Sequence, residues 1–133
     1  MSVKPFLDTN VLVYAFTKDD PRQEKALSLL AAGGLISVQV LNEFVNASHR
    51  KMRYEWPEIE RQRSLLFELL DLPVPLTLAV HESAVSLTRR YKLSIYDSLI
   101  IAAALQAGCP IVYSEDMQHE QAIAGVTIRN PFV

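Results

Sequence analysis

Short apolar runs alternate with longer amphipathic segments along the chain, which is the pattern of a parallel α/β protein. Apolar runs of strand length fall at residues 3–7, 35–37, 74–78, 110–113 and 126–129. The segments between them repeat apolar residues at helical spacing, as Val80, Ala84 and Leu87 do. Strands that alternate with helices predict a three-layer α/β/α arrangement, with a central parallel sheet of four or five strands and helices on both faces.

Capping residues and helix breakers set the expected helix boundaries. Helices are expected over residues 11–16, from the Asp19-Asp20-Pro21 turn to Ala32, after Ser37, after Trp56-Pro57 and from Ser94 to Gly108. A short helix around residues 117–123 is expected if Asp116 is its N-cap. The segment 99–107 is apolar on nearly all sides, so we expect it near the centre of the fold.

The composition fits a single globular domain over residues 1–133. Half of the residues are hydrophobic and 21% are charged, so the chain can bury a real core. The lone cysteine, Cys109, is expected to be a buried, inert thiol, which fits a reducing cytoplasm. We expect no membrane association, because no apolar run approaches ~18 residues, and no signal peptide, because residues 1–6 lack a long apolar core.

Four acidic residues occupy positions where full solvation is not expected. Asp8 and Asp116 each follow an apolar strand, Glu43 borders the apolar face of its helix, and Asp97 begins the central helix. Ligands of parallel sheets bind beyond the carboxyl ends of the strands. Each acid alone is better explained as a cap or a boundary residue, Asp97 most of all, but together they indicate a shared site.

The electrostatics of such a cluster favour a bound cation. Two carboxylates ~4 Å apart repel by about 4 kcal/mol at an effective dielectric constant of 20. Oxygen ligands favour hard cations such as Mg²⁺ or Mn²⁺, which can activate water and stabilise a leaving oxygen of a phosphodiester. The net charge of −2 argues mildly against a nucleic-acid binder, unless bound cations supply the positive charge locally.

Four sequence motifs in order resemble those of a known family. They are FLDTNVLVY at residues 6–14, SVQVLNEF at 37–44, YDSLI at 96–100 and SEDMQ at 114–118, with IRNPF at 128–132. The whole chain resembles PIN domains and is most similar to the VapC toxins of bacterial and archaeal toxin–antitoxin pairs. The resemblance implies an Mg²⁺- or Mn²⁺-dependent endoribonuclease acting on RNA, a homodimer, and a VapB-type antitoxin whose tail blocks the active site.

The resemblance also assigns residues to roles. The family's metal-binding, catalytic acids correspond to Asp8, Glu43, Asp97 and Asp116. Its hydroxyl and amide after the first acid correspond to Thr9 and Asn10, and its hydroxyl before the fourth acid corresponds to Ser114. Glu115 is a rival of Asp116 as the fourth acid. One departure is Glu120, where related sequences often have glycine.

A basic residue is also expected beside the acids. Arg50 lies two helical turns after Glu43 on nearly the same side, with Asn46 between them, so an RNA phosphate could meet it there. A solvated arginine is an equally good interpretation. Two other functions stay open: a catalytically inactive PIN-like interaction module, and a phosphoacceptor domain, for which Lys4 is the only lysine near the early strand.

Overall fold

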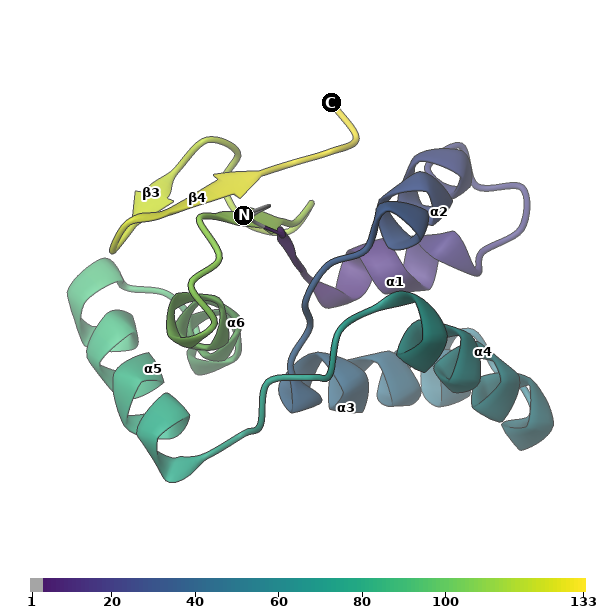
Figure 1. The fold of residues 1–133 in the computed structure, drawn as a ribbon, viewed down its shortest axis with the longest axis horizontal. Coiled ribbons are helices and arrows are strands. Elements are labelled where there is room, and N and C mark those ends of the chain that lie inside the picture. Colours follow the sequence, from purple (N-terminus) through teal and green to yellow (C-terminus); the bar gives the residue numbers. More distant parts are fainter. Residues whose placement is uncertain (1–3) are drawn as a thin grey trace.

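The computed structural model describes residues 4–133, which form a sheet flanked by helices (Figure 1). The strands are β1 (Phe6–Leu7), β2 (Ile111–Tyr113), β3 (Ala122–Ile123) and β4 (Val126–Arg129). The α-helices are α1 (Thr9–Ala15), α2 (Gln23–Ala32), α3 (Val38–Asn46), α4 (Trp56–Leu69), α5 (Leu78–Tyr91) and α6 (Ile95–Gln106), and a π-helical turn, η1 (Ala47–Lys51), follows α3. Val3, expected to begin the first strand, lies outside the described residues.

The order of the strands creates a switch point beside β1. The sheet runs β1-β2-β4-β3, and β1, β2 and β4 are parallel. Parallel bridges add Leu35 on the other side of β1, and then Val74 beside Ser37. The chain therefore leaves β1 in one direction, reaches Val74, and returns across β1 to β2. This reversal places α1 to α4 on one side of the sheet and α5 and α6 on the other (Figure 1).

Two of the expected strands are shorter than the apolar pattern predicts. The segment at 35–37 contributes only the bridges of Leu35 and Ser37, and the segment at 74–78 contributes only Val74. The prediction for residues 75–78 was wrong because the Thr77 side chain accepts a hydrogen bond from the backbone N–H of Val80 and caps α5, which begins at Leu78. The expected α2 also begins later, at Gln23.

The short helix expected around residues 117–123 was wrong, because this segment ends in a β-hairpin. β3 pairs antiparallel with β4 at the edge of the sheet, whose other strands, β1, β2 and β4, are parallel as expected. Ala124 and Gly125 connect the two strands, and both have positive φ, of 52° and 93°. A two-residue turn with positive φ at both positions matches the twist of an antiparallel pair.

The helix that contains Glu43 does not continue with α-helical geometry. After Asn46 it passes into the π-helical turn η1, in which the backbone N–H of Met52 bonds to the carbonyl of Ala47, five residues earlier. A π-turn inserts one extra residue, so every later side chain is rotated relative to an α-helix, and such turns often occur at functional sites.

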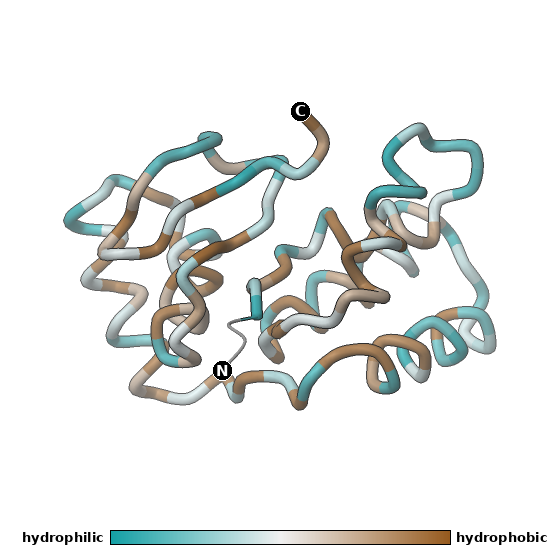
Figure 2. The backbone as a smooth tube through the Cα atoms, turned by 45° about the horizontal axis from the view of Figure 1, so that its top comes forward, coloured by the Kyte–Doolittle hydropathy of each residue, from teal (hydrophilic) through white to brown (hydrophobic). Residues whose placement is uncertain are grey.

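The core confirms the expected position of the apolar helix. Seven consecutive residues of α6, Ser98 to Ala104, are buried, and Ser98 accepts a hydrogen bond from the Thr88 hydroxyl of α5. The strands and the helix segments that face them are largely apolar, whereas polar residues gather in the outer turns (Figure 2). Cys109 is a buried free thiol, as expected. Among the helices of residues 4–133, none is long and apolar enough to span a membrane.

Candidate active site

Asp8 lies at the switch point of the sheet, directly after β1. Its backbone N–H bonds to Tyr113 at the end of β2, and its carboxylate caps α1 by accepting a hydrogen bond of 2.7 Å from the backbone N–H of Thr9. Ser114 Oγ donates a second hydrogen bond of 2.7 Å to Asp8 Oδ2. The Asp8 side chain is only 4% exposed, so β1 and β2 together hold a carboxylate inside the protein.

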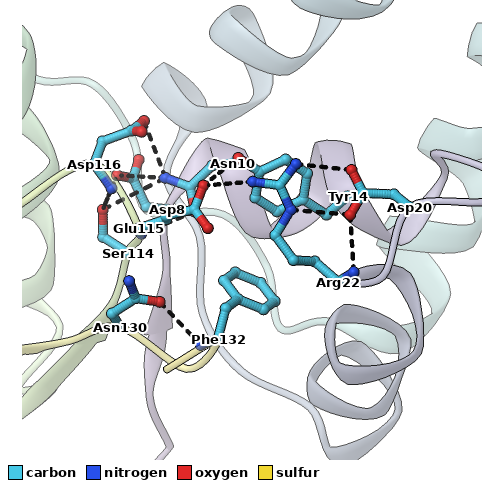
Figure 3. A network of polar contacts seen from close by, with 10 residues as sticks. All are labelled: Asp8, Asn10, Tyr14, Asp20, Arg22, Ser114, Glu115, Asp116, Asn130 and Phe132. Atoms are coloured by element: carbon cyan, nitrogen blue, oxygen red, sulfur yellow. Dashed lines mark hydrogen bonds and ion pairs between the residues drawn. The ribbon is translucent and has the colours of Figure 1, made fainter.

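The side chain of Asn10 connects the ends of β1 and β2. Its amide Nδ2 lies 3.1 Å from Asp116 Oδ2 and 3.4 Å from Asp8 Oδ2, and its Oδ1 accepts a hydrogen bond from the backbone N–H of Glu115 (Figure 3). Ser114 Oγ in turn accepts from the backbone N–H of Asp116. The two strand-end carboxylates, Asp8 and Asp116, are thus held on either side of one amide.

Glu43 joins the site from α3. Thr9 Oγ1 donates a hydrogen bond of 3.0 Å to Glu43 Oε1, and Gln39, one helical turn earlier, donates one of 2.9 Å to Glu43 Oε2. Ser37 caps this helix by accepting from the backbone N–H of Val40, as the sequence predicts. Both carboxylate oxygens are therefore oriented by neighbours, although Glu43 stays half-buried.

Asp97 is coupled to the other acids of the site by electrostatic repulsion. It lies in the first turn of α6, whose N-cap Ser94 accepts from the Asp97 backbone N–H at 3.0 Å, so the expected capping role is confirmed. Partial burial raises the pKa of the Asp97 carboxyl, and the charges of Asp116 and Glu43 raise it further. The three carboxylates are therefore within electrostatic reach of one another.

Burial also controls the protonation of Asp8. Its pKa is raised from 3.8 to about 6, mainly by burial and to a smaller extent by the charges of Glu43 and Asp116. The hydrogen bonds from Ser114 and Thr9 lower the same pKa, but they do not compensate for the burial. A carboxyl group with such a pKa is poised to exchange a proton or to accept a cation near neutral pH.

Glu115 is directed away from this group of acids. Its Oε1 accepts hydrogen bonds from the Tyr14 hydroxyl and, at 2.7 Å, from Arg22, whose guanidinium lies 3.7 Å above the Tyr14 ring (Figure 3). Arg22 also pairs with Asp20. Neighbouring Asp116 faces Asn10 instead. This geometry supports Asp116 over Glu115 as the fourth acid.

A small pocket opens onto these residues. It encloses about 270 Å³ and is lined from α1, α3, η1 and the turn after β2; its lining residues are Thr9, Asn10, Val13, Tyr14, Glu43, Ala47, Lys51 and Asp116. We call it the catalytic pocket. Asp8 lies behind Asn10 and is not part of the lining, and Asp97 does not line it either.

The basic residue at this pocket is Lys51, not Arg50. The expectation for Arg50 assumed an uninterrupted α-helix, and the extra residue of the π-turn brings Lys51 to the pocket while Arg50 lines a neighbouring cavity with Trp56. Asn46 is exposed and does not line the pocket. No sequence motif marks Lys51 or Arg22 as residues of the site. Gln39 could have been predicted, because it lies four residues before Glu43 and therefore on the same side of the helix.

The donor chemistry fits a hard divalent cation, because Asp8, Glu43, Asp97 and Asp116 offer carboxylate oxygens. Burial is the main cause of the raised pKa values of Asp8 and Asp97, and the charges of neighbouring acids, which a cation would offset, raise them further. Within residues 4–133, no three His, Cys, Asp or Glu side chains converge closely enough to hold a metal together. Mg²⁺ is commonly bound through one or two carboxylates while it keeps several waters, so it does not require such a convergence.

Comparison with known proteins identifies the family. The sequence model of the PIN domain matches residues 6–123, so the chain belongs to the PIN-domain family, as its motifs indicate. A comparison with curated protein sequences gives no match.

Solved structures with the same fold cover nearly the whole chain. A toxin–antitoxin complex from Klebsiella pneumoniae is 22% identical, with a TM-score of 0.72 over 96% of this chain and 97% of that one. Mycobacterium tuberculosis VapC20, described as a sarcin-ricin loop cleaving toxin, is 21% identical, with a TM-score of 0.69 over 84% and 88%. DNA-bound VapBC from Salmonella typhimurium is 17% identical, with a TM-score of 0.67 over 98% and 99%. These likenesses establish the shared fold.

Proposed function

We propose that this protein is a divalent-metal-dependent endoribonuclease and the toxin of a VapBC-type toxin–antitoxin pair. The observation that carries the proposal is the buried carboxylate of Asp8, whose pKa is raised to about 6 beside Asn10 and Asp116 at the switch point of the sheet. Membership of the PIN-domain family and the fold shared with VapC20, a toxin described as cleaving the sarcin-ricin loop, support it.

The reaction would be hydrolysis of an RNA phosphodiester. Water attacks the phosphorus in line, the new P–O bond forms as the bond to the 3′ oxygen breaks, and a proton passes to that oxygen. The products carry a 5′-phosphate and a 3′-hydroxyl. One of the four acids takes the proton from the attacking water.

We propose that Asp8, Glu43, Asp97 and Asp116 hold Mg²⁺ or Mn²⁺, directly or through water. The cation, when bound, lowers the pKa of water and neutralises the charge of the phosphate. The other residues keep the acids in place. Ser114 and Asn10 fix the Asp8 carboxylate, Thr9 and Gln39 fix that of Glu43, and Asn10 connects Asp8 to Asp116.

The test is cleavage of total RNA by purified protein with Mg²⁺ or Mn²⁺ and with EDTA. We expect cleavage only with the cation, and a loss of roughly 100-fold or more in the variant Asp8→Asn. Asp19→Asn is the matched control, because Asp19 is an exposed aspartate in the turn before α2 and its positive φ of 64° suits asparagine. Cleavage in EDTA, or full activity of Asp8→Asn, would refute the proposed mechanism.

The partners follow from the same proposal. One solved structure with this fold is described as a toxin–antitoxin complex and another as VapBC. We therefore propose a VapB-type antitoxin for this chain too, and a homodimer in the cytoplasm. A short reading frame for a DNA-binding protein directly upstream of this gene is expected. Co-expression of the two products should give a complex that no longer cleaves RNA, and an RNase activity unaffected by that product would contradict the assignment.

An inactive interaction module is the competing function. The observation in its favour is that no three metal-ligating side chains of residues 4–133 converge on one point. Calorimetric titration separates the two functions, because the nuclease should bind Mn²⁺ or Mg²⁺ at millimolar concentration or below, and Asp8→Asn should weaken that binding. No heat of binding for either cation would favour the module.

A further inference from the structure

We propose that a surface beside the catalytic pocket binds the unpaired nucleotides that flank the cleaved bond. The surface, which we call the platform, consists of five exposed residues: His49, Arg50, Lys51, Arg53 and Trp56. Its ligand is single-stranded nucleic acid, held by base stacking and by contacts to phosphate. The inference rests on the proposed ribonuclease function and specifies how that enzyme would hold its substrate.

The platform contains a preformed aromatic stack. The imidazole of His49 lies on the indole of Trp56, with ring centroids 4.4 Å apart and planes 24° from parallel. Trp56 stands at the start of α4, where Pro57 stiffens the first turn, and half of its surface is exposed. Aromatic faces of this kind bind the bases of single strands with little sequence preference, and they cannot stack on bases that are paired within a duplex.

Cations surround the stack. Arg50 and Arg53 line a cavity of about 520 Å³ together with His49 and Trp56, and Tyr54 and Glu55 complete its wall. Neither arginine forms an ion pair within residues 4–133, and Glu55 is the one acidic residue of the lining. Guanidinium groups without a carboxylate partner can bind phosphate oxygens. The cavity therefore suits a ligand that carries both a phosphate and an aromatic base.

The π-turn connects the platform to the catalytic pocket. Lys51 lines the catalytic pocket, whereas its neighbour Arg50 lines the cavity with the stacked rings. From Glu43 to Lys51 the helix advances roughly 12 Å, a span of very few nucleotides. A strand whose phosphate lies at the acids would therefore pass Lys51 and reach Trp56 without leaving the positively charged surface.

A solvated helix end and a protein interface fit the platform less well than a nucleic-acid site does. An ordinary solvated helix end would account for the cations, but it leaves an exposed tryptophan with a stacked histidine unexplained. Trp and Arg are also frequent at protein interfaces. The clustering of cations on a chain whose net charge is −2, and the continuity with the catalytic pocket, favour a nucleic-acid ligand.

The test uses the fluorescence of Trp56, which is the only tryptophan of the chain. The full-length protein is titrated in EDTA, so that no cleavage occurs, with a short RNA oligonucleotide of unstructured sequence and with the same sequence as a duplex. Stacking of a base on Trp56 should quench the fluorescence with the single strand, and the duplex should give little or no quenching. Binding of the labelled oligonucleotide is followed in parallel by fluorescence anisotropy.

Variants assign the two kinds of contact. Trp56→Ala should weaken binding between about 5-fold and 150-fold, the range for loss of one stacked base, while Trp56→Phe keeps most of the affinity. Arg50→Gln with Arg53→Gln should lower the slope of log affinity against log salt by about 1.4, because two phosphate contacts are lost. The matched control replaces the exposed Arg89 and Arg90 of α5 by glutamine, and its salt slope should not change.

The outcomes separate this inference from the proposed function. Quenching by the single strand without cleavage in Mg²⁺ would support the platform and refute the nuclease. Cleavage that persists while Trp56 is not quenched and its variants bind normally would refute the platform and leave the nuclease standing. If the variants bind the oligonucleotide normally but lose antitoxin binding or self-association, the platform is a protein interface and the inference is overturned.

Discussion

Replacing Asp8 by asparagine should make the protein more stable at neutral pH in the absence of metal. The Asp8 carboxyl has a pKa of about 6 in the folded protein and about 3.8 when it is exposed. The folded state therefore binds the proton more tightly than the unfolded state does. The contribution of the Asp8 carboxyl to the free energy of unfolding is fully present below pH 3.8 and is lost as the pH rises through 6.

The magnitude follows from the difference between the two pKa values. A difference of about two pH units between the folded and unfolded pKa values corresponds to about 3 kcal/mol of unfolding free energy. The wild-type protein is less stable by this amount above pH 7, because the buried Asp8 carboxylate is then charged. Asparagine removes this charge, and it still caps α1 for Thr9. It gives up one of the hydrogen bonds that Asp8 accepts from Ser114 and Asn10, at a cost of about 1 kcal/mol. We therefore expect a net gain of roughly 1 to 2 kcal/mol.

The assay is urea unfolding in EDTA at several pH values between 4 and 8. The wild-type protein should lose stability across this window, whereas Asp8→Asn should lose less, and Asp19→Asn should follow the wild type. Mg²⁺ should then stabilise the wild type more than Asp8→Asn, because only the wild type has the full set of acids. Equal stability of wild type and Asp8→Asn at pH 8, with parallel pH profiles, would contradict the conclusion that the buried, charged carboxylate of Asp8 destabilises the folded protein.

Three further substitutions test neighbouring contacts. Asp116→Asn should reduce RNA cleavage roughly 100-fold, while Glu115→Gln, which changes the Tyr14 side of the turn, should stay within about tenfold of wild type; the reverse order would exchange their roles. Ser114→Ala should destabilise by about 1 to 3 kcal/mol and move the pH profile of unfolding upward, because its hydrogen bond lowers the pKa of Asp8. Glu120→Gly should stabilise by less than about 1 kcal/mol and leave cleavage unchanged, since φ at this position is 66°; destabilisation in urea would contradict the strain argument.

The sequence predicts best those parts of the site that depend on local structure. Asp8 ends a buried strand, and Ser94 caps the helix of Asp97, so both positions can be inferred from a few neighbouring residues. Glu120, which departs from the family motif, has a φ of 66°, a conformation that favours glycine, and its carboxylate pairs with Arg129. The contact between Thr9 and Glu43 joins residues far apart in the chain, and only the fold brings them together.

The parts that could not be predicted depend on unusual backbone geometry. The hairpin of β3 and β4 turns at Ala124 and Gly125, which lack the Asn-Gly or Asp-Gly signal of such turns. In the sequence, Asp116 instead has the place of an N-cap for a short helix over residues 117–123. Propensity and periodicity describe regular elements, and this turn depends on pairing with a strand that is already fixed in the sheet.

The π-turn is another irregular element that the sequence does not predict, and it changes which basic residue lines the catalytic pocket. In a regular α-helix, where each residue turns by about 100°, Arg50 would lie within about 20° of Glu43 and Lys51 about 80° away. One inserted residue reverses that order, so Lys51 lines the catalytic pocket and Arg50 turns to the aromatic stack. The same three cations at 50, 51 and 53 are thereby divided between two neighbouring cavities. In the proposed nuclease, this single irregular turn would join the acidic catalytic pocket to a basic, aromatic surface that holds the RNA strand beside the bond to be cleaved.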